Sequence, residues 1–338
     1  NNMSNKSKQF AVVITLLLFC FLFLGCEEKV PEKSIDEQLG FDLKLYEINL
    51  KDALNNNAWS TLGNIKIESL DSLKSFYAAK NYNALLIKTL ASKPMLDSLI
   101  AIIGNAEKHG LNPERYNYST IKNLFASSFK NGLQPEQRLK QLSRLEVLLI
   151  DAIIKYSSDM RHGVLNPRML YEKTHFLPVN DSLNTKFLEP VNQNNILLYL
   201  ENIQPKSKIY KDLQNTLVRF RKIESVDWQP IIFTDKKIEA GQSSDKITEV
   251  YKKLIILGLL DTLTYKTKDP VVYDSVLVNS IKTFQRINGL VDDGVIGKGT
   301  IERLNITPKQ YVEKIKLNLE RLRWSDYSDT TKYILVNI

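Results

Sequence analysis

The stretch FQRINGLVDDGVIGKGT, residues 284–300, decides the fold that we predict for the C-terminal part of the chain. Asp293-Gly294 is typical of a tight turn, and Gly297 permits a second reversal of the backbone. Thr300 follows at a position that favours the start of a short helix. We therefore expect a glycine-shaped loop that leads into a short helix.

Two amphipathic helices are predicted before this loop. One is DKITEVYKKLIILGLL, residues 245–260, which ends at Gly258, and the other is VLVNSIKTFQRINGL, residues 276–290. Their apolar residues recur at spacings of three and four. These residues are Ile247, Val250, Leu254 and Leu257 in the first helix and Leu277, Ile281 and Phe284 in the second. With the short helix they predict a three-helix module over about 245–305.

Helical periodicity also runs through most of the chain before this module. RLEVLLIDAIIKYSSDMRHG, residues 144–163, predicts a largely buried helix. PKSKIYKDLQNTLVRFRKI, residues 205–223, predicts an amphipathic helix. Its expected apolar face consists of Ile209, Leu213, Leu217 and Phe220. A boundary is expected near residues 225–245, where polar residues and Trp228-Gln229-Pro230 interrupt the pattern. The predicted fold class is mainly α.

A recurring sequence pattern, a glycine followed shortly by a proline, separates several of these helices. KHGLNPERY at 108–116 and HGVLNP at 162–167 each place a glycine at a helix end and Asn-Pro at the start of the next helix. NGLQPEQRL at 131–139 is a weaker version. His109 and His162 precede the first two glycines, where a cation would suit the helix dipole. A ligand loop is the alternative interpretation, but a structural joint between helices is favoured.

The composition argues against several kinds of site. Both cysteines, Cys20 and Cys26, lie in the first 26 residues, so the rest of the chain predicts no disulfide, thiolate nucleophile or sulfur-bound metal. His109, His162 and His175 do not form a ligand motif, and we expect neither a metal nor a cofactor. The formal net charge of +8 indicates affinity for an anionic surface. Because the basic residues are spread along helical faces, a nucleic-acid partner is not expected.

Residues 1–26 predict a lipoprotein signal peptide. The uncharged run FAVVITLLLFCFLFLG at 10–25 follows a basic segment and is shorter than the roughly twenty residues that a membrane span needs. LFLGC at 22–26 resembles a bacterial lipobox, which implies cleavage before Cys26 and lipidation of its sulfur. An uncleaved anchor and a signal without lipidation are the alternatives. A polar linker is expected over 27–40.

The module at 240–306 resembles the peptidoglycan-binding type 1 domain through its arrangement FQ…GL…DG…G…T. The preceding chain resembles the helical scaffold domain of the large periplasmic L,D-transpeptidases of the YcbB type, which implies a scaffold over 41–228. The segments that carry this second resemblance are LKSFYAAKNYNALLI at 73–87, AEKHGLNPERYNY at 106–118 and LLIDAIIKYSSDMRHGVLNP at 148–167. One departure is Leu85-Leu86, where the family often carries a tryptophan.

Residues 307–338 resemble the connector and the start of that family's catalytic domain. KLNLERLRW at 316–324 matches the connector, and Tyr333–Ile338 would be the first strand of a β-rich YkuD catalytic domain. In this family a cysteine thiolate attacks the carbonyl after diaminopimelate in a stem tetrapeptide, releases D-alanine and forms a 3-3 cross-link by acyl transfer. No cysteine follows Cys26, and no HG…SxGC motif is present. The resemblance therefore implies a truncated enzyme without its catalytic cysteine and histidine.

Two other functional classes stay open at this point. The chain could be a stand-alone envelope lipoprotein that binds peptidoglycan without catalysis, or a secreted hydrolase with the same binding domain. For the truncated transpeptidase and the stand-alone lipoprotein, the expected partners are peptidoglycan and a membrane, the second through the lipid on Cys26. The expected location is the periplasm of a bacterial cell envelope.

The loop also supplies the candidate site residues. We expect Asp292, Asp293 and Thr300 to contact peptidoglycan. Gly289, Gly294 and Gly297 are expected to shape the loop whatever it binds. Phe284 and Gln285 are expected to be core and turn-stabilising residues instead of ligand contacts.

Overall fold

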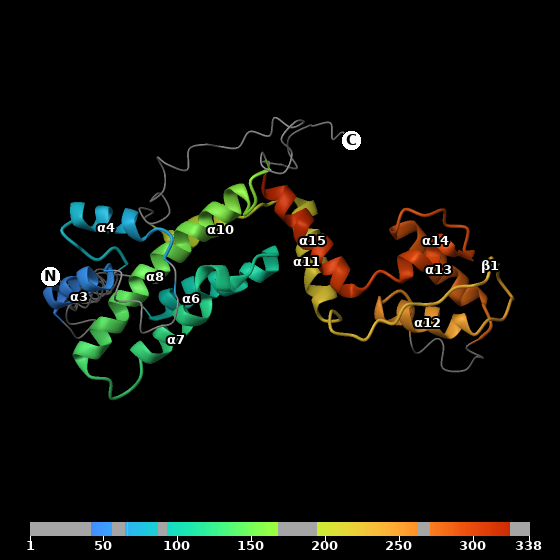
Figure 1. Cartoon of the computed structure of the whole chain (residues 1–338), viewed down its shortest axis with the longest axis horizontal. Helices are drawn as coiled ribbons and strands as arrows, with labels where there is room; N and C mark the ends of the chain where they lie inside the picture. Colours follow the sequence, from blue (N-terminus) through green and yellow to red (C-terminus); the bar gives the residue numbers. More distant parts are fainter. Residues whose placement is uncertain are drawn as a thin grey trace, which may run out of the picture.

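The computed structural model describes residues 42–55, 65, 67–86, 93–167, 195–261 and 271–324. This part of the chain is mainly helical, which confirms the predicted class. Its strands are β1 (Lys237–Ile238) and β2 (Ile296–Gly297), which pair antiparallel. Figure 1 shows a larger helical body and a smaller one, with α11 (Lys208–Arg221) and α15 (Pro308–Arg323) between them. Cys20, Cys26, His175 and the strand expected at 333–338 lie outside the described residues.

The larger helical body precedes the small module in the sequence. Its elements are α3 (Leu43–Ala53), α4 (Leu70–Ala79), α6 (Lys93–Gly104), η2 (Asn105–His109), η3 (Pro113–Tyr116), α7 (Tyr118–Ser128), α8 (Pro135–His162) and α10 (Ile196–Asn202). The η elements are 3-10 helices, so Asn112-Pro113 opens a 3-10 turn where the sequence predicted a helix start. Within the described ranges, no helix has the length and apolar character to cross a membrane.

Helix α8 is the centre of this body, and the prediction of a largely buried helix is confirmed. It begins earlier than the expected 144–163, because Pro135 is already compatible with the first helical turn. Glu146 is fully buried and accepts hydrogen bonds from the hydroxyls of Tyr46 and Tyr77, each at 2.6 Å, and from the Leu85 backbone N–H at 2.8 Å. Burial raises the pKa of Glu146. These donors explain how a carboxyl group fits inside the core.

Helices α11 (Lys208–Arg221) and α15 (Pro308–Arg323) form the stalk between the two bodies. They run in opposite directions. Phe220 near the end of α11 lies against Tyr311 near the start of α15, with ring centroids 5.1 Å apart, and Arg323 at the end of α15 reaches Tyr210 near the start of α11. The apolar residues buried between them are Tyr210, Leu217 and Phe220 from α11 and Val312, Ile315 and Leu319 from α15.

One residue of the apolar face predicted for α11 is wrong. Ile209 is 53% exposed, while its neighbour Tyr210 is fully buried. Tyr210, Leu217 and Phe220 share one side of the helix, and α15 covers that side. The spacing of apolar residues along α11 could not show whether position 209 or 210 is buried, because the helix that covers Tyr210 lies about a hundred residues further along the sequence.

The small module contains α12 (Lys246–Ile256), α13 (Ser275–Ile287) and α14 (Lys298–Leu304), as the sequence predicted. The apolar residues of α12 and α13 enter one core, with Leu257 partly buried against it. Ile231 and Ile238 join this core from the segment that was expected to be a boundary. The segment 225–245 is therefore anchored to the module by a few apolar side chains, although most of its residues are exposed.

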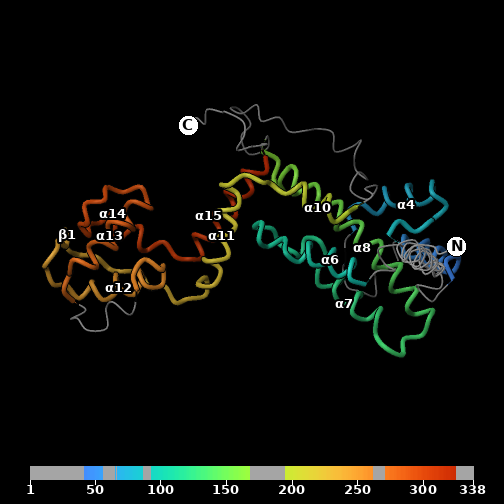
Figure 2. Tube along the Cα trace, turned by 180° about the vertical axis from the view of Figure 1, so that it is seen from behind, coloured from blue at the N-terminus to red at the C-terminus, as the bar shows by residue number. Residues whose placement is uncertain are grey.

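The two ends of the module are held together where it joins the stalk. The Asn305 side chain accepts a hydrogen bond from Ile231 N at 2.8 Å and donates one to Ile231 O at 3.0 Å. Trp228 Nε1 donates to Leu304 O at 3.0 Å, and Lys253 Nζ lies 4.7 Å from the centre of the Trp228 ring. Figure 2 shows the chain leaving the stalk through α11 and returning through α15. The module is thus an insertion between two helices that pack on each other.

Candidate functional site

The loop of the module begins at the end of α13. Gly289 and Gly294 adopt φ values of 69° and 78°, in the left-handed region that favours glycine. A Cβ on Gly294 would also lie 2.9 Å from Lys282 Cε. Gly297 differs, because its φ of −110° is extended backbone that any residue can adopt. The loop therefore needs glycine at 289 and 294 for its backbone course, while at 297 the backbone conformation does not require it.

Gln285 organises the interior of this loop. Its Nε2 donates to Val295 O at 2.9 Å and to Thr300 Oγ1 at 3.2 Å, and its Oε1 accepts from Gly294 N at 2.9 Å. Gln285 is 2% exposed, and the neighbouring Phe284 lies in the module's core. Both residues thus have the structural roles expected from the sequence.

The three predicted contact residues lie in different surroundings. Thr300 is buried in the Gln285 network. Asp293 is exposed as a residue, but its Oδ1 accepts hydrogen bonds from Val295 N at 2.8 Å and from Gln285 Nε2 at 3.1 Å. Asp292 is exposed and pairs with Arg286 at 3.0 Å, and the hydrogen bond from Arg286 lowers the pKa of Asp292. Both aspartates are thus exposed, but Asp293 turns Oδ1 toward the loop's own backbone, whereas Asp292 pairs with a side chain on the surface.

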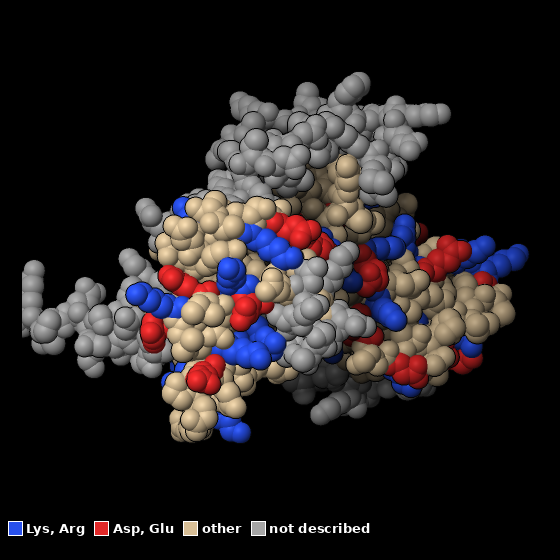
Figure 3. Space-filling model, turned by 60° about the vertical axis from the view of Figure 1, so that its left-hand side comes forward, with Lys and Arg blue, Asp and Glu red and all other residues tan. Residues whose placement is uncertain are grey.

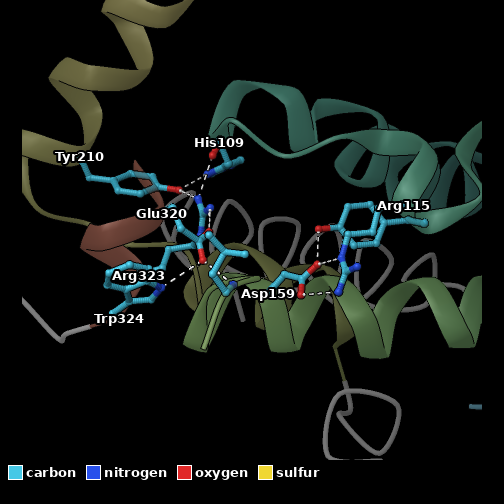
Figure 4. A network of polar contacts seen from close by, with 9 residues as sticks. His109, Arg115, Asp159, Tyr210, Glu320, Arg323 and Trp324 are labelled. Atoms are coloured by element: carbon cyan, nitrogen blue, oxygen red, sulfur yellow. Dashed lines mark hydrogen bonds and ion pairs between the residues drawn. The ribbon is translucent and has the colours of Figure 1, made fainter. Parts of the chain in front are cut away.

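A second polar site joins the end of α15 to the larger body (Figure 4). Arg323 is buried and donates from Nη1 to the His109 carbonyl oxygen at 2.8 Å and to the Tyr210 hydroxyl at 3.1 Å. Its Nη2 is paired with Glu320. Glu320 also accepts from Leu165 N at 2.8 Å and from Trp324 Nε1 at 3.0 Å. This network fixes the end of α15 beside the end of α8.

His109 is neutral in this network, so the expected cation at the helix end is wrong. Burial, together with the nearby charges of Arg323 and Lys108, lowers its pKa to about 4. Its Nδ1 lies 3.0 Å from the Tyr210 hydroxyl and 3.1 Å from Gln214 Nε2. Because Gln214 Nε2 can only donate, Nδ1 is an acceptor here, as in a neutral imidazole. Burial likewise lowers the pKa of His162.

Helix α15 packs against two of the three glycines that end the predicted helices. A Cβ on Gly110 would lie 3.2 Å from Lys316 Cα, and a Cβ on Gly163 would lie 2.5 Å from Glu320 Oε1. Gly132, in the weaker third version of the joint, has nothing within 4 Å. All three glycines have φ values between 75° and 78°. The first two joints therefore do more than end helices, since they let α15 approach the backbone closely.

Sequence reasoning missed this docking role. The one available signal was that His-Gly and Asn-Pro occur together in the 108–116 and 162–167 joints but not in 131–139. That difference coincides with contact to α15, but nothing local in the sequence indicates the contact.

Two family models match the chain. Residues 71–217 match the Scaffold domain, and residues 243–304 match the peptidoglycan binding domain. A comparison with curated proteins finds no match. The two matches support an L,D-transpeptidase-like architecture. In this architecture the matched scaffold ends within α11, and α15, beyond the matched module, packs back on α11.

The L,D-transpeptidase-like architecture supports peptidoglycan as a partner, a role in peptidoglycan binding or cell-wall remodelling, and a location in the cell envelope. Basic and acidic side chains are interspersed on the face drawn in Figure 3. In the part of the chain that the structure describes, no group of three or more His, Cys, Asp or Glu side chains is placed to hold a metal ion.

Proposed function

We propose that the chain is the scaffold and peptidoglycan-binding portion of an L,D-transpeptidase of the YcbB type, which forms 3-3 cross-links by cysteine acyl transfer. The observation that carries the proposal is the insertion of a matched peptidoglycan-binding module between α11 and α15, two helices that pack together against a matched scaffold. Because the two ends of the inserted module are hydrogen-bonded to each other, the module would hold its ligand at a defined place relative to the scaffold.

This portion binds and positions the cell wall. The module would hold the peptidoglycan, and the stalk would set the orientation of the module. The Glu320–Arg323 network would fix the end of the stalk beside α8. The acyl transfer of the family needs a thiolate, and the printed sequence has no cysteine after Cys26. We therefore assign binding and positioning, and not turnover, to the residues at hand.

Attachment to the membrane is part of the proposal. Residues 1–26 would be a lipoprotein signal, with lipid on Cys26 after cleavage. Growth with a radiolabelled fatty acid should label the protein, and Cys26→Ser should abolish the label. Equal labelling of the variant would contradict lipidation at this residue.

Sedimentation with purified sacculi tests the binding function. The full chain should co-sediment at low salt. As a control, a short Gly-Ser linker can replace residues 232–304, because Ile231 and Asn305 are already hydrogen-bonded to each other. The shortened protein should stay in the supernatant with α11 and α15 still packed. Failure of the full chain to sediment would reject the proposed function.

The transpeptidase assignment has a separate test. Sequencing the gene beyond Ile338 should show an open reading frame that encodes a YkuD-type domain with its cysteine. A stop codon directly after Ile338 would contradict the assignment and favour the stand-alone binding lipoprotein.

A further inference from the structure

The two most exposed large apolar side chains of the described residues lie at the end of α13 and in the turn that follows it. Val291 is 79% exposed and Ile287 is 67% exposed, the two highest values among such side chains in these ranges. Single exposed apolar residues are common, but a pair formed by the last residue of α13 and a residue of the turn that follows it, in a matched binding domain, indicates a contact surface. We call residues 286–292, RINGLVD, the crown of the module.

The backbone turn of the crown is preformed, and an exposed ion pair joins its two ends. Arg286 Nε and Nη2 each lie 3.0 Å from Asp292 Oδ2, and this pair closes the two ends of the crown. Leu290 N donates to Gln285 O at 2.9 Å, and Gly289 provides the left-handed residue of the turn. The exposed aliphatic side chains are therefore presented by a preformed turn, which lowers the entropy cost of binding.

The chemistry of the crown fits a peptide better than a sugar. None of the residues in RINGLVD is aromatic. The neighbouring Tyr311 donates its hydroxyl to Asn288 Oδ1, but its ring packs against Phe220 in the stalk and is not offered to a sugar face. The crown offers two aliphatic side chains beside one guanidinium and one carboxylate. A guanidinium binds carboxylate groups well, and a carboxylate binds ammonium groups. The stem peptide of peptidoglycan combines methyl side chains, carboxylates and, at its diamino residue, an ammonium group.

We propose that the crown binds the stem peptide of peptidoglycan and not its glycan strand. Val291 and Ile287 contact alanine methyl groups, Arg286 binds a peptide carboxylate, and Asp292 binds the ammonium of the diamino residue. The Arg286–Asp292 pair can open to exchange partners, because an ion pair this exposed is weak in water. This inference rests on the proposed peptidoglycan-binding function and names the part of the polymer that is recognised.

The test is a competition assay on sacculi with the full chain. The competitors are a soluble stem tetrapeptide with a free diamino residue and glycan strands from which an amidase has removed the peptides. We expect the tetrapeptide to displace the protein and the bare glycan to leave it bound. Val291→Ser and Ile287→Ser should each weaken binding to sacculi about tenfold through loss of apolar contact. Arg286→Gln should reduce competition by the tetrapeptide.

Ile232→Ser is the matched control. Ile232 is 65% exposed but lies next to Ile231, which is held at Asn305, outside the crown. This variant should bind within twofold of the unchanged protein, and thermal unfolding checks that all variants are folded.

The outcomes separate the two proposals. If bare glycan displaces the protein from sacculi and the tetrapeptide does not, the crown assignment is overturned while the binding function stands. The same holds if Ile232→Ser weakens binding as much as Val291→Ser and Ile287→Ser do. Absence of any binding by the unchanged protein rejects the proposed function itself.

Discussion

Gly163 and Glu320 are in direct contact across the junction between α8 and α15. A Cβ on Gly163 would lie 2.5 Å from Glu320 Oε1 and 2.6 Å from Trp324 Nε1. Gly163 also has φ 78° and ψ 169°, a combination that is essentially restricted to glycine. Glycine is therefore required at 163 both for the backbone and for the approach of α15, and the junction depends on it.

Gly163→Ala is expected to lower the free energy of unfolding by at least about 2 kcal/mol, because backbone strain and displacement of Glu320 act together. Gly132→Ala is the matched control, since Gly132 has φ 77° and open space around it. Its cost should be about 1 kcal/mol from the backbone alone. Urea unfolding measures both, and equal losses would contradict the docking role of Gly163.

The Glu320–Arg323 pair should be strongly coupled in stability. Arg323→Met leaves the Glu320 carboxylate buried without its cation, which typically costs about 3–5 kcal/mol. Glu320→Gln should also destabilise, and the double variant should lose less than the sum of the two losses. Asp212→Asn on the exposed Lys208–Asp212 pair of the same stalk should change stability by less than about 0.5 kcal/mol. Additive losses at 320 and 323 would show that the two residues act independently.

Stability should fall as the pH is lowered from about 6.5 toward 4 because of His109. The unfolded imidazole takes up a proton near pH 6.5, whereas burial beside Arg323 holds the folded pKa at about 4. Protonation in this window therefore favours the unfolded state. The shift corresponds to roughly 3 kcal/mol across the window.

The variant His109→Gln isolates this contribution. Other groups titrate in both proteins, so the difference in unfolding free energy between them should shrink or reverse as the pH falls through the window. His162→Gln is the comparison, because burial lowers the pKa of His162 as well, but this residue is only partly buried. A difference between the unchanged protein and His109→Gln that stays constant from pH 7.5 to 4.5 would be inconsistent with a buried neutral His109.

Gln285→Leu should disrupt the loop of the module. The substitution keeps a side chain of similar size but leaves Gly294 N without its partner, while Val295 O keeps only its hydrogen bond from Thr300 Oγ1. Leaving a buried donor such as Gly294 N unpaired costs about 1–3 kcal/mol. Hydrogen exchange at Gly294 should accelerate, and binding to sacculi should fall. Arg286→Gln breaks only an exposed ion pair and should leave the exchange rate at Gly294 nearly unchanged. Equal exchange rates in the two variants would contradict the role given to Gln285.

Much of the fold follows from interactions between residues close in sequence. Asp274 caps α13 by accepting a hydrogen bond from Leu277 N, and Asn112 caps the 3-10 turn that Pro113 opens. The Asp293-Gly294 turn is similarly local. Because such interactions span only a few positions, residue type and spacing predict the helices, the joints and the loop of the module.

The site residues were only partly predictable. Asp292, Asp293 and Thr300 were chosen for their places near the loop, but the sequence could not show which side chains turn inward. Thr300 is buried against Gln285, while Val291 and Ile287, absent from the prediction, are the most exposed large apolar side chains of the described residues. A loop pattern specifies a backbone course, and the direction of each side chain depends on what packs beneath it.

The helix pattern and the loop of the module were thus determined by local sequence, but the junction was decided by tertiary structure. Arg323 reaches the carbonyl oxygen of His109 across 214 positions in the chain, and the same packing buries Tyr210 in place of Ile209. It also makes His109 neutral and brings Gly163 against Glu320. The spacing of residues does not predict these relationships. Each depends on α15, which follows the inserted module in the sequence and packs on surfaces that do not themselves specify a partner.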